Sequence, residues 1–212
     1  MTTRAALRWP ERIFFIFGLL LLGLWFKNNS EARTFHSAET KKLEAARLVE
    51  GPWCPAQLES GVFGRIEIPR LGISALIAEG TGPAQLDRAV GHISSTVFPG
   101  QLGNCALAGH RDSFLRGLGD VRENDVIRID TLQDTYTYAV EWGTVVEPCR
   151  VDVLDDTASP SLTVVTCFPF HDVGPAPRRF VVRARLIEAG TNATSISHRT
   201  APPSQGRTAE GR

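Results

Sequence analysis

Short apolar runs separated by glycine and proline follow one another through residues 61–188. Valine, isoleucine and threonine are frequent in these runs, and such β-branched residues fit the half-buried surface of a pleated sheet. The runs are Gly64–Pro69, Ile73–Ile77, Cys105–Ala108, Val126–Ile129, Thr135–Val146, Val151–Leu154, Leu162–Cys167 and Phe180–Ile187. Many short strands with few helices are typical of sheets that close on themselves. The pattern therefore predicts an all-β fold, a closed or nearly closed barrel of about eight strands.

Two short helical segments and a polar tail complete the predicted domain. Pro83 to Val90 has proline at its start and Gly91 after its end, which is the usual order for a helix. A second segment, Asp112 to Leu118, is expected to form a short helical turn. Residues 189–212 are rich in small and polar residues with almost nothing to bury, so we expect a disordered tail after a barrel that spans residues 61–188.

An uninterrupted apolar stretch, Ile13–Phe26, precedes the predicted barrel and follows Arg4, Arg8 and Arg12. A helix over this stretch would be roughly 21 Å long, against a hydrocarbon layer of about 30 Å. Interfacial side chains at its ends can lengthen the span. The arginines predict that residues 1–12 stay in the cytoplasm. The stretch is therefore interpreted as a single-pass membrane anchor, with the barrel on the extracytoplasmic side.

Two other interpretations of the apolar stretch stay open. A cleaved signal peptide has an apolar region of about this length, and Ser30-Glu31-Ala32 offers small residues at a cleavage-like spacing. A buried core helix fits poorly, because the stretch has no polar face. Both the anchor and the signal peptide export the domain, and residues 27–60 are then a polar stalk or linker before it.

Charge and cysteine usage narrow the function. The chain carries 23 Lys and Arg against 23 Asp and Glu, so its charge predicts no nucleic-acid partner. Four cysteines (Cys54, Cys105, Cys149 and Cys167) lie in the part of the chain predicted to be exported, where disulfides are permitted. None has Cys-x-x-Cys spacing, and we expect no metal or cofactor. Cys105 and Cys149 are expected to be structural, either as a disulfide or as two buried thiols.

Cys167 stands at the exit of the most strand-like run in the chain. The run Ser161–Thr166 leads directly into it and stops at Phe168-Pro169, because proline cannot continue a strand ladder. A thiol on a rigid strand end, beside a loop from Phe168 to Pro177, is well placed for a nucleophile. A lone cysteine in such a strand is more often a small buried hydrophobe. The abrupt stop and the nearby histidine and arginine candidates favour the catalytic interpretation.

His110 is the preferred general base, because it directly follows the strand-like run Cys105–Ala108 and Gly109. His171 lies only four residues past Cys167, but its loop contains glycine and prolines and is expected to hold a side chain less firmly. The other histidines are expected to be solvated or packed. A cysteine and a histidine on the ends of two strands, with an arginine nearby, would form a thiol transferase or hydrolase site.

Two adjacent arginines, Arg178 and Arg179, begin the last run. Alternation along a strand puts Arg179 on the face opposite Phe180, toward a groove, whereas Arg178 shares the face of Phe180. Arginine suits a developing oxyanion because its planar donors never lose their charge. A solvated role is open for either arginine. We expect Arg179 to be the catalytic cation, and Arg178, Thr166 and His171 to contact the substrate.

The segment Thr163–Cys167 resembles the Thr-Leu-x-Thr-Cys signature of sortases, the membrane-anchored cysteine transpeptidases, with Val164 where the signature has leucine. The resemblance extends from about Gly64 to Ile187. The other matching pieces are Gly64–Pro69, Leu86–His92, Pro99–Gly100 with Gly103–Asn104, Leu107–Phe114 and Arg179–Val182. Each piece is short, and their order and spacing together are specific. The single anchor and the Gly-His-Arg-Asp run are most similar to class D sortases.

The resemblance implies an eight-stranded β-barrel with Cys167, His110 and Arg179 as its catalytic set, and Asp112 is not required as a further member. It implies that the thiolate attacks a threonine carbonyl in a sorting motif similar to Leu-Pro-x-Thr-Gly or Leu-Pro-x-Thr-Ala. The thioacyl enzyme then passes the acyl group to an amine. The implied partners are exported proteins that carry such a motif, an amine acceptor in the cell envelope or on another protein, and the membrane.

Two functions from other classes stay open. A thiol-dependent endopeptidase would use the same three residues and release the acyl group to water. A non-catalytic, exported barrel that binds peptides would need none of them. An L,D-transpeptidase is also a Cys/His enzyme, but its Ser-His-Gly-Cys run is absent from this sequence.

Overall fold

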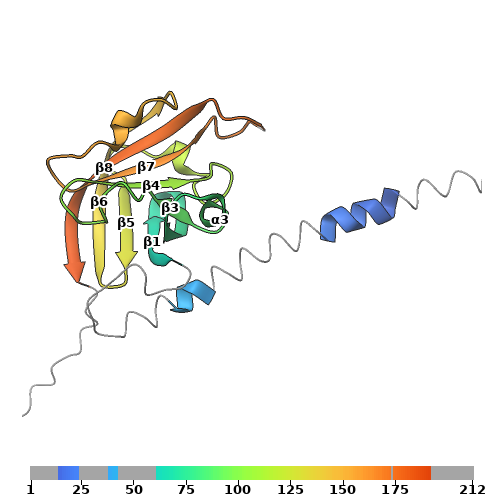
Figure 1. The fold of residues 1–212 in the computed structure, drawn as a ribbon, viewed down its shortest axis with the longest axis horizontal. Helices are drawn as coiled ribbons and strands as arrows, with labels where there is room; N and C mark the ends of the chain where they lie inside the picture. Colours follow the sequence, from blue (N-terminus) through green and yellow to red (C-terminus); the bar gives the residue numbers. More distant parts are fainter. Residues whose placement is uncertain (1–13, 24–37, 43–60, 173, 192–212) are drawn as a thin grey trace, which may run out of the picture.

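The computed structural model describes residues 14–23, 38–42, 61–172 and 174–191. Residues 61–172 and 174–191 contain eight strands that form one closed barrel (Figure 1). In chain order the strands are β1 (Val62–Ile68), β2 (Ile73–Glu79), β3 (Val90–His92), β4 (Asn104–Gly109), β5 (Val126–Thr131), β6 (Asp134–Val146), β7 (Ser161–Phe168) and β8 (Arg178–Thr191). The prediction of an all-β, closed barrel is confirmed.

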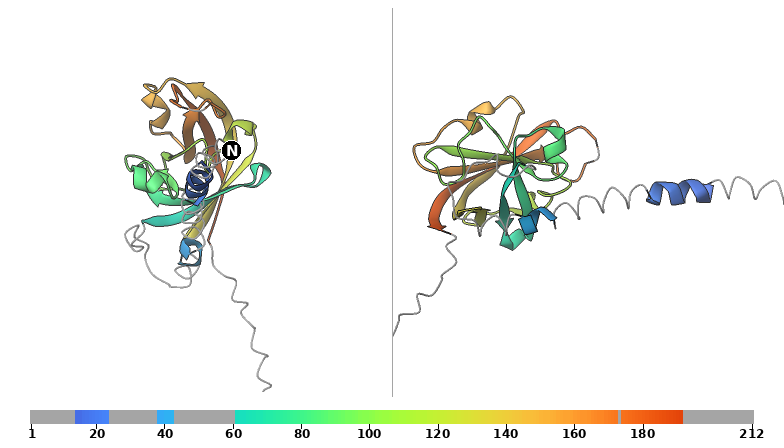
Figure 2. Two further views of the ribbon diagram at one scale, coloured as in Figure 1. Left: turned by 90° about the vertical axis from the view of Figure 1, so that its right-hand side faces the viewer. Right: turned by 60° about the horizontal axis from the view of Figure 1, so that its bottom comes forward.

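The strands follow the order β1-β2-β3-β4-β7-β8-β6-β5 around the barrel, and β5 pairs again with β1. Figure 2 shows this closed arrangement from two further directions. Two neighbouring pairs, β2 with β3 and β4 with β7, run parallel, whereas the others are antiparallel. Because β4 and β7 are parallel neighbours, their C-terminal ends lie at the same edge of the barrel. This edge carries Gly109 and Phe168, the last residues of the two strands.

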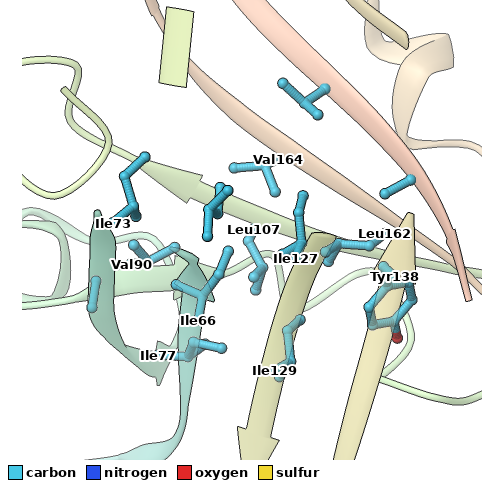
Figure 3. Close-up of a cluster of buried hydrophobic side chains, with 14 of the residues drawn as sticks. Ile66, Ile73, Ile77, Val90, Leu107, Ile127, Ile129, Tyr138, Leu162 and Val164 are labelled. Carbon is cyan, nitrogen blue, oxygen red and sulfur yellow. The ribbon is translucent and has the colours of Figure 1, made fainter. Parts of the chain in front are cut away.

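Apolar side chains from all eight strands fill the interior of the barrel. Figure 3 labels Ile66, Ile73, Ile77, Val90, Leu107, Ile127, Ile129, Tyr138, Leu162 and Val164 in this cluster. Each fully buried Leu or Ile side chain contributes about 1.5–3 kcal/mol relative to leaving it exposed. The hydroxyl of Tyr138 is not left unsatisfied, because it accepts a hydrogen bond from the backbone N–H of Gly100 at 2.8 Å. The core thus also holds the loop between β3 and β4.

The segment Pro83–Val90, predicted as one helix, divides into two elements. Only α3 (Pro83–Leu86) is helical, and Val90 begins β3, where it pairs with Ile77 of β2. Val90 is fully buried in the core. The prediction was wrong at this end because a valine gains more from burial in a strand than a single helical turn offers through propensity.

The run Val151–Leu154, predicted as a strand, forms the 3-10 helix η4 (Val151–Leu154) instead. Val151 is 68% exposed, so the run lacks an apolar face to bury. The carbonyl of Val153 accepts hydrogen bonds from Asn104 Nδ2 at 3.2 Å and from Arg183 Nη2 at 2.8 Å. Side chains of the barrel wall therefore satisfy a backbone group that a strand would direct to a neighbouring strand.

Two further 3-10 helices lie in the connections, η2 (Pro69–Leu71) and η3 (Leu118–Asp120). The segment Asp112–Leu118, predicted as a helical turn, consists of turns that lead into η3. β8 continues to Thr191, which pairs with Asp134 of β6, so the barrel extends beyond the predicted start of the tail.

Residues 14–23 and 38–42 are helical. The large apolar side chains of the first helix are 50–79% exposed. The second contacts β1, where Arg65 Nη2 donates a hydrogen bond to Thr40 Oγ1 at 2.5 Å. No helix in the described part of the chain has the length and apolarity that crossing a bilayer requires. The predicted anchor, residues 13–26, extends past the described helix at both ends.

Several predictions about the ends of the chain lie outside the described residues. These concern the cytoplasmic segment 1–12, the stalk 27–60 apart from residues 38–42, and the tail from residue 192 onward.

Candidate active site

Three neighbouring strands bring the predicted catalytic residues to one level of the barrel wall. In the parallel pair of β4 and β7, Gly109 lies opposite Thr166, so the next residues along are His110 and Cys167. In the antiparallel pair of β7 and β8, Cys167 lies opposite Arg179. Adjacent strands are about 4.8 Å apart. The register therefore places an imidazole and a guanidinium on either side of the thiol.

Cys167 belongs to the outer face of its strand. Leu162 and Val164 of β7 point into the core, as Figure 3 shows. Because side chains alternate along a strand, Thr163, Val165 and Cys167 share the opposite face. Cys167 is partly exposed, so its sulfur can be reached from solvent.

His110 follows β4 directly, and its side chain is 44% exposed. Its Nε2 lies 3.8 Å from Oδ1 of Asp87, which caps the C-terminal end of α3. This distance is too long for a hydrogen bond but allows an ion pair when the imidazole is protonated. Asp112, which is nearer in sequence, is exposed and makes no ion pair with His110 in the described part of the chain. The pairing with Asp87 depends on how α3 packs, so no sequence motif indicates it.

The guanidinium of Arg179 rests on the loop between β7 and β8, here called the β7–β8 loop (residues 169–177). Its Nη1 donates to the carbonyls of Ala176 at 3.0 Å and Arg178 at 3.1 Å. Directly opposed residues of antiparallel strands point to the same face, so Arg179 and Cys167 share the outer face. Arg178 lies on the other side, with its guanidinium carbon 5.0 Å from the centre of the Phe168 ring.

The three predicted substrate-contacting residues differ in their surroundings. Thr166 is 2% exposed, and its hydroxyl donates to the carbonyl of Gly109 at 2.7 Å. This hydroxyl therefore links β7 to β4. His171 and Arg178 are exposed, the first in the β7–β8 loop and the second at the start of β8.

Sequence reasoning missed Arg111, which is buried next to His110. Its Nη1 donates to the carbonyl of Pro169 at 2.6 Å and its Nη2 to the carbonyl of Gly174 at 2.7 Å. The Gly-His-Arg-Asp run drew attention to this residue, but only the fold reveals that its side chain turns toward the β7–β8 loop.

The other cysteines have different environments from the one predicted for them. Cys105 is buried in the core, and burial, together with the charge of Glu79, raises the pKa of its thiol. Cys149 is exposed in the connection between β6 and η4. Among the described residues all cysteines are free thiols, so the expectation of a Cys105–Cys149 disulfide or of two buried thiols is wrong. Strand β4 holds Cys105 in the core, whereas Cys149 lies in a surface connection.

A family model described as the sortase domain matches residues 66–187, which is more than half of the 212 residues. This match covers the thiol strand β7 and its neighbour β4 in full and β8 as far as Ile187. The chain belongs to the sortase family.

Several relatives support this membership. Sortase D of Bacillus subtilis is 29% identical over 125 residues, a match that covers 58% of this chain and 63% of the relative. Sortase A of Streptococcus agalactiae is 30% identical over 178 residues, covering 80% of this chain and 70% of the relative. The chain spans less than two thirds of the Bacillus relative.

Among solved structures, the Clostridium perfringens sortase D5 transpeptidase superimposes with a TM-score of 0.61 at 27% identity. That match covers 75% of this chain and 99% of the other. Both class A and class D sortases are therefore similar to this chain, and the resemblance to class D has support from sequence and from structure.

Proposed function

We propose that this chain is a membrane-anchored cysteine transpeptidase of the sortase type, with a class D character. The observation that carries the proposal is the register of three adjacent strands, which sets Cys167 opposite Arg179 and level with His110. A thiol flanked by a base and a permanent cation supplies a nucleophile, a proton carrier and an oxyanion donor.

In the first half of the reaction, the Cys167 thiolate attacks the carbonyl carbon of a threonine in the sorting motif. Negative charge moves onto the carbonyl oxygen, where the Arg179 guanidinium donates hydrogen bonds. The carbon–nitrogen bond then breaks, and His110 gives its proton to the departing amine. The acyl group remains on sulfur as a thioester.

In the second half, an amine of the cell envelope or of another protein attacks the thioester. His110 removes the proton from this amine, and the carbon–sulfur bond breaks to restore the thiolate. The substrate is expected to be an exported protein with a Leu-Pro-x-Thr-Gly-like or Leu-Pro-x-Thr-Ala-like motif.

The proposed location is the cell membrane, with the barrel outside the cytoplasm. The apolar side chains of residues 14–23 support this, because they are left exposed rather than packed into the barrel. Arg4, Arg8 and Arg12 precede that helix, in keeping with an N-terminus on the cytoplasmic side.

The decisive experiment is to incubate the full chain in detergent with a library of sorting-motif peptides, with and without an added amine. Mass analysis should reveal conjugates in which the carbonyl of the motif threonine is joined to the added amine, and a Cys167→Ala variant should form none. Hydrolysed peptide alone, even with excess amine, would identify a thiol endopeptidase. Peptide binding without any bond cleavage would identify a non-catalytic barrel.

A further inference from the structure

Arg111 directly follows His110, yet its side chain turns inward and is 9% exposed. Its two terminal nitrogens donate to the carbonyls of Pro169 and Gly174, at 2.6 and 2.7 Å. A single guanidinium thus bridges two points of the β7–β8 loop, which begins two residues after Cys167. The residue beside the proposed base is therefore bonded to the loop beside the proposed nucleophile.

The residues directly before and after His110 each form a hydrogen bond with a residue near Cys167. Before His110, the carbonyl of Gly109 accepts the hydroxyl of Thr166 at 2.7 Å. After His110, Arg111 reaches the carbonyl of Pro169. The two segments are thus tied together once before and once after the reacting residues. Losing the second tie would leave His110 held from one side only.

Stability alone is a weak reason to bury this charge. In the described part of the chain, no carboxylate lies within ion-pair distance of the Arg111 guanidinium. Burying a cation is costly, and it gains less from carbonyl oxygens than from an opposite charge. The planar fork of an arginine does, however, set the separation of the two carbonyls that it binds. The arrangement therefore favours a geometric role.

The remaining contacts of the β7–β8 loop make Arg111 more important during the reaction. The Phe170 ring packs 5.4 Å from the Phe180 ring and lies over Gly119, where a Cβ would come within 2.8 Å of the ring. At the far end, Arg179 holds the carbonyl of Ala176. When Arg179 donates to a substrate oxyanion, its bond to Ala176 is available for exchange. The hydrogen bonds of Arg111 to Pro169 and Gly174 would then still fix the β7–β8 loop, because Arg111 takes no part in the reaction.

We propose that Arg111 is a positioning residue, which locks the β7–β8 loop onto the end of β4 and so keeps His110 level with Cys167. This inference rests on the proposed function, since the geometry that Arg111 maintains is that of the acyl-transfer site. Arg111 itself contacts neither the thiol nor, in this proposal, the substrate. Its effect should therefore fall on the chemical step rather than on substrate binding.

The test compares Arg111→Met, Arg111→Lys and the control Arg116→Met in the full chain in detergent. Methionine keeps an apolar stem but removes the donors, and Arg116 is an exposed arginine of the same connection. We expect Arg111→Met to lower kcat by about 10²-fold while KM changes less than about threefold, because a small misplacement of catalytic groups acts on the reaction step. Lysine should rescue poorly, since it lacks the fork. Arg116→Met should match the parent protein.

Two measurements do not depend on acyl transfer. Chymotryptic cleavage after Phe170 should accelerate about tenfold or more in Arg111→Met, because cleavage follows local opening of the loop. The pH dependence of Cys167 alkylation, resolved by mass from the other cysteines, should shift to higher pH. The register places His110 and Arg179 beside this thiol, with Arg111, Arg178, His171 and Asp172 in the adjoining segments, and His110 is the group that the substitution should displace. Arg111→Lys keeps the charge of Arg111, so a shift in that variant as well reports the displacement of His110. Improved access alone would change the rate at every pH without shifting the profile.

Each contrary result has a definite meaning. Unchanged cleavage, unchanged kcat, or a rise in KM alone in Arg111→Met overturns the positioning role. If that variant does not fold, Arg111→Gln keeps one donor nitrogen in place of two and must be intermediate in cleavage and in the alkylation profile. If the parent protein transfers no acyl group, the proposed function fails, and an unshifted alkylation profile in Arg111→Met then overturns this inference independently.

Discussion

At the scale of single residues, the described cysteines differ in what surrounds their sulfur atoms. Cys105 is 1% exposed, and burial raises the pKa of its thiol, so it stays protonated and inaccessible in the folded protein. Cys149 is exposed and Cys167 is partly exposed. Reactivity toward an alkylating reagent depends on both thiolate fraction and access.

We therefore expect iodoacetamide at pH 8 to modify Cys105 at least about 10²-fold more slowly than Cys149, because β4 must open first. Peptide mapping by mass gives both rates in one sample. Denaturation should remove the difference. Equal rates in the native protein would contradict the burial of Cys105.

Arg179 and Arg178 are adjacent but lie on opposite faces of β8, and only Arg179 is opposite Cys167. Replacing Arg179 by Ala should lower kcat by about 10²–10³-fold, the usual cost of losing one oxyanion donor. Arg179→Lys should recover little, because an ammonium lacks the forked geometry. Arg178→Ala should cost about tenfold or less. Steady-state kinetics of the three variants on one peptide measure these differences. A larger loss of kcat in Arg178→Ala than in Arg179→Ala would mean that Arg178, rather than Arg179, is the oxyanion donor.

At the scale of elements, a buried polar network attaches the connection between β6 and β7 to the barrel wall. Asn104 donates to the carbonyls of Val153 and Asp155, and its Oδ1 accepts the hydroxyl of Thr163 at 2.7 Å. Arg183 adds a bond to the carbonyl of Val153, and burial lowers the pKa of its guanidinium. The network lies toward the N-terminal ends of β4 and β7, away from the strand ends that lead to His110 and Cys167.

Thr163→Val should test the strength of this network. Valine has nearly the shape of threonine but leaves the buried Oδ1 of Asn104 without its donor, which costs about 1–3 kcal/mol of unfolding free energy. Urea unfolding monitored by tryptophan fluorescence measures the loss. The control is Thr144→Val on the exposed part of β6, which should change stability by less than about 0.5 kcal/mol. A neutral Thr163→Val would mean that another group satisfies Asn104.

An ion pair connects η2 to the segment before β5. Arg70 donates to both carboxylate oxygens of Asp125 at 2.5 Å, and this hydrogen bonding is the main reason that the pKa of Asp125 is lowered. A carboxyl with a lowered folded pKa stabilises the protein above its unfolded pKa of about 3.9, and this contribution is lost as the pH falls through the folded value.

Asp125→Asn should therefore lower Tm at pH 7, and its difference from the parent protein should shrink below about pH 4. Thermal unfolding by circular dichroism across pH 3–7 provides the comparison. Asp112→Asn, at an exposed position, should differ little from the parent protein at any pH. A Tm difference for Asp125→Asn that stays constant down to pH 3 would rule out the ionised pair as its source.

At the scale of the whole molecule, the N-terminus of the mature protein distinguishes the proposed membrane anchor from a cleaved signal peptide. Membrane-extracted protein should retain the peptides before Ala32, because a spanning helix is not removed. Mass mapping of the N-terminus decides this. A new N-terminus between Glu31 and Thr34 would contradict the anchor and leave the barrel as a released, extracytoplasmic domain.

Most of the barrel follows from its sequence, because local pattern and final packing agree there. The run Leu162–Cys167 is β-branched, ends at a proline and is observed as β7. The exceptions are short segments whose fate depends on distant partners. Val90 joins a strand because β2 lies beside it. Val151 does not, because the side chains of Asn104 and Arg183 bind the backbone carbonyl of Val153 in the same segment. No local pattern contains that information.

The candidate site divides in the same way. Cys167, His110 and Arg179 could be chosen from strand ends and alternation, since their placement needs only the register of adjacent strands. The contacts of Asp87 and Arg111 could not be predicted, because each joins two connecting segments that are far apart in sequence and meet only in the folded barrel.

The pairing of β7 has a consequence for how a peptide can be recognised. The strand that carries the thiol pairs with β8 along its whole length and with β4 from Ser161 to Thr166. Its unpaired edge on the β4 side is limited to Cys167 and Phe168, which is too short for an extended peptide to add as a further strand. A substrate must lie over the outer surface of the wall instead, and its sequence must be read by side chains and by loop carbonyls. Changes of specificity can thus arise in the connections while the interior of the barrel stays as it is.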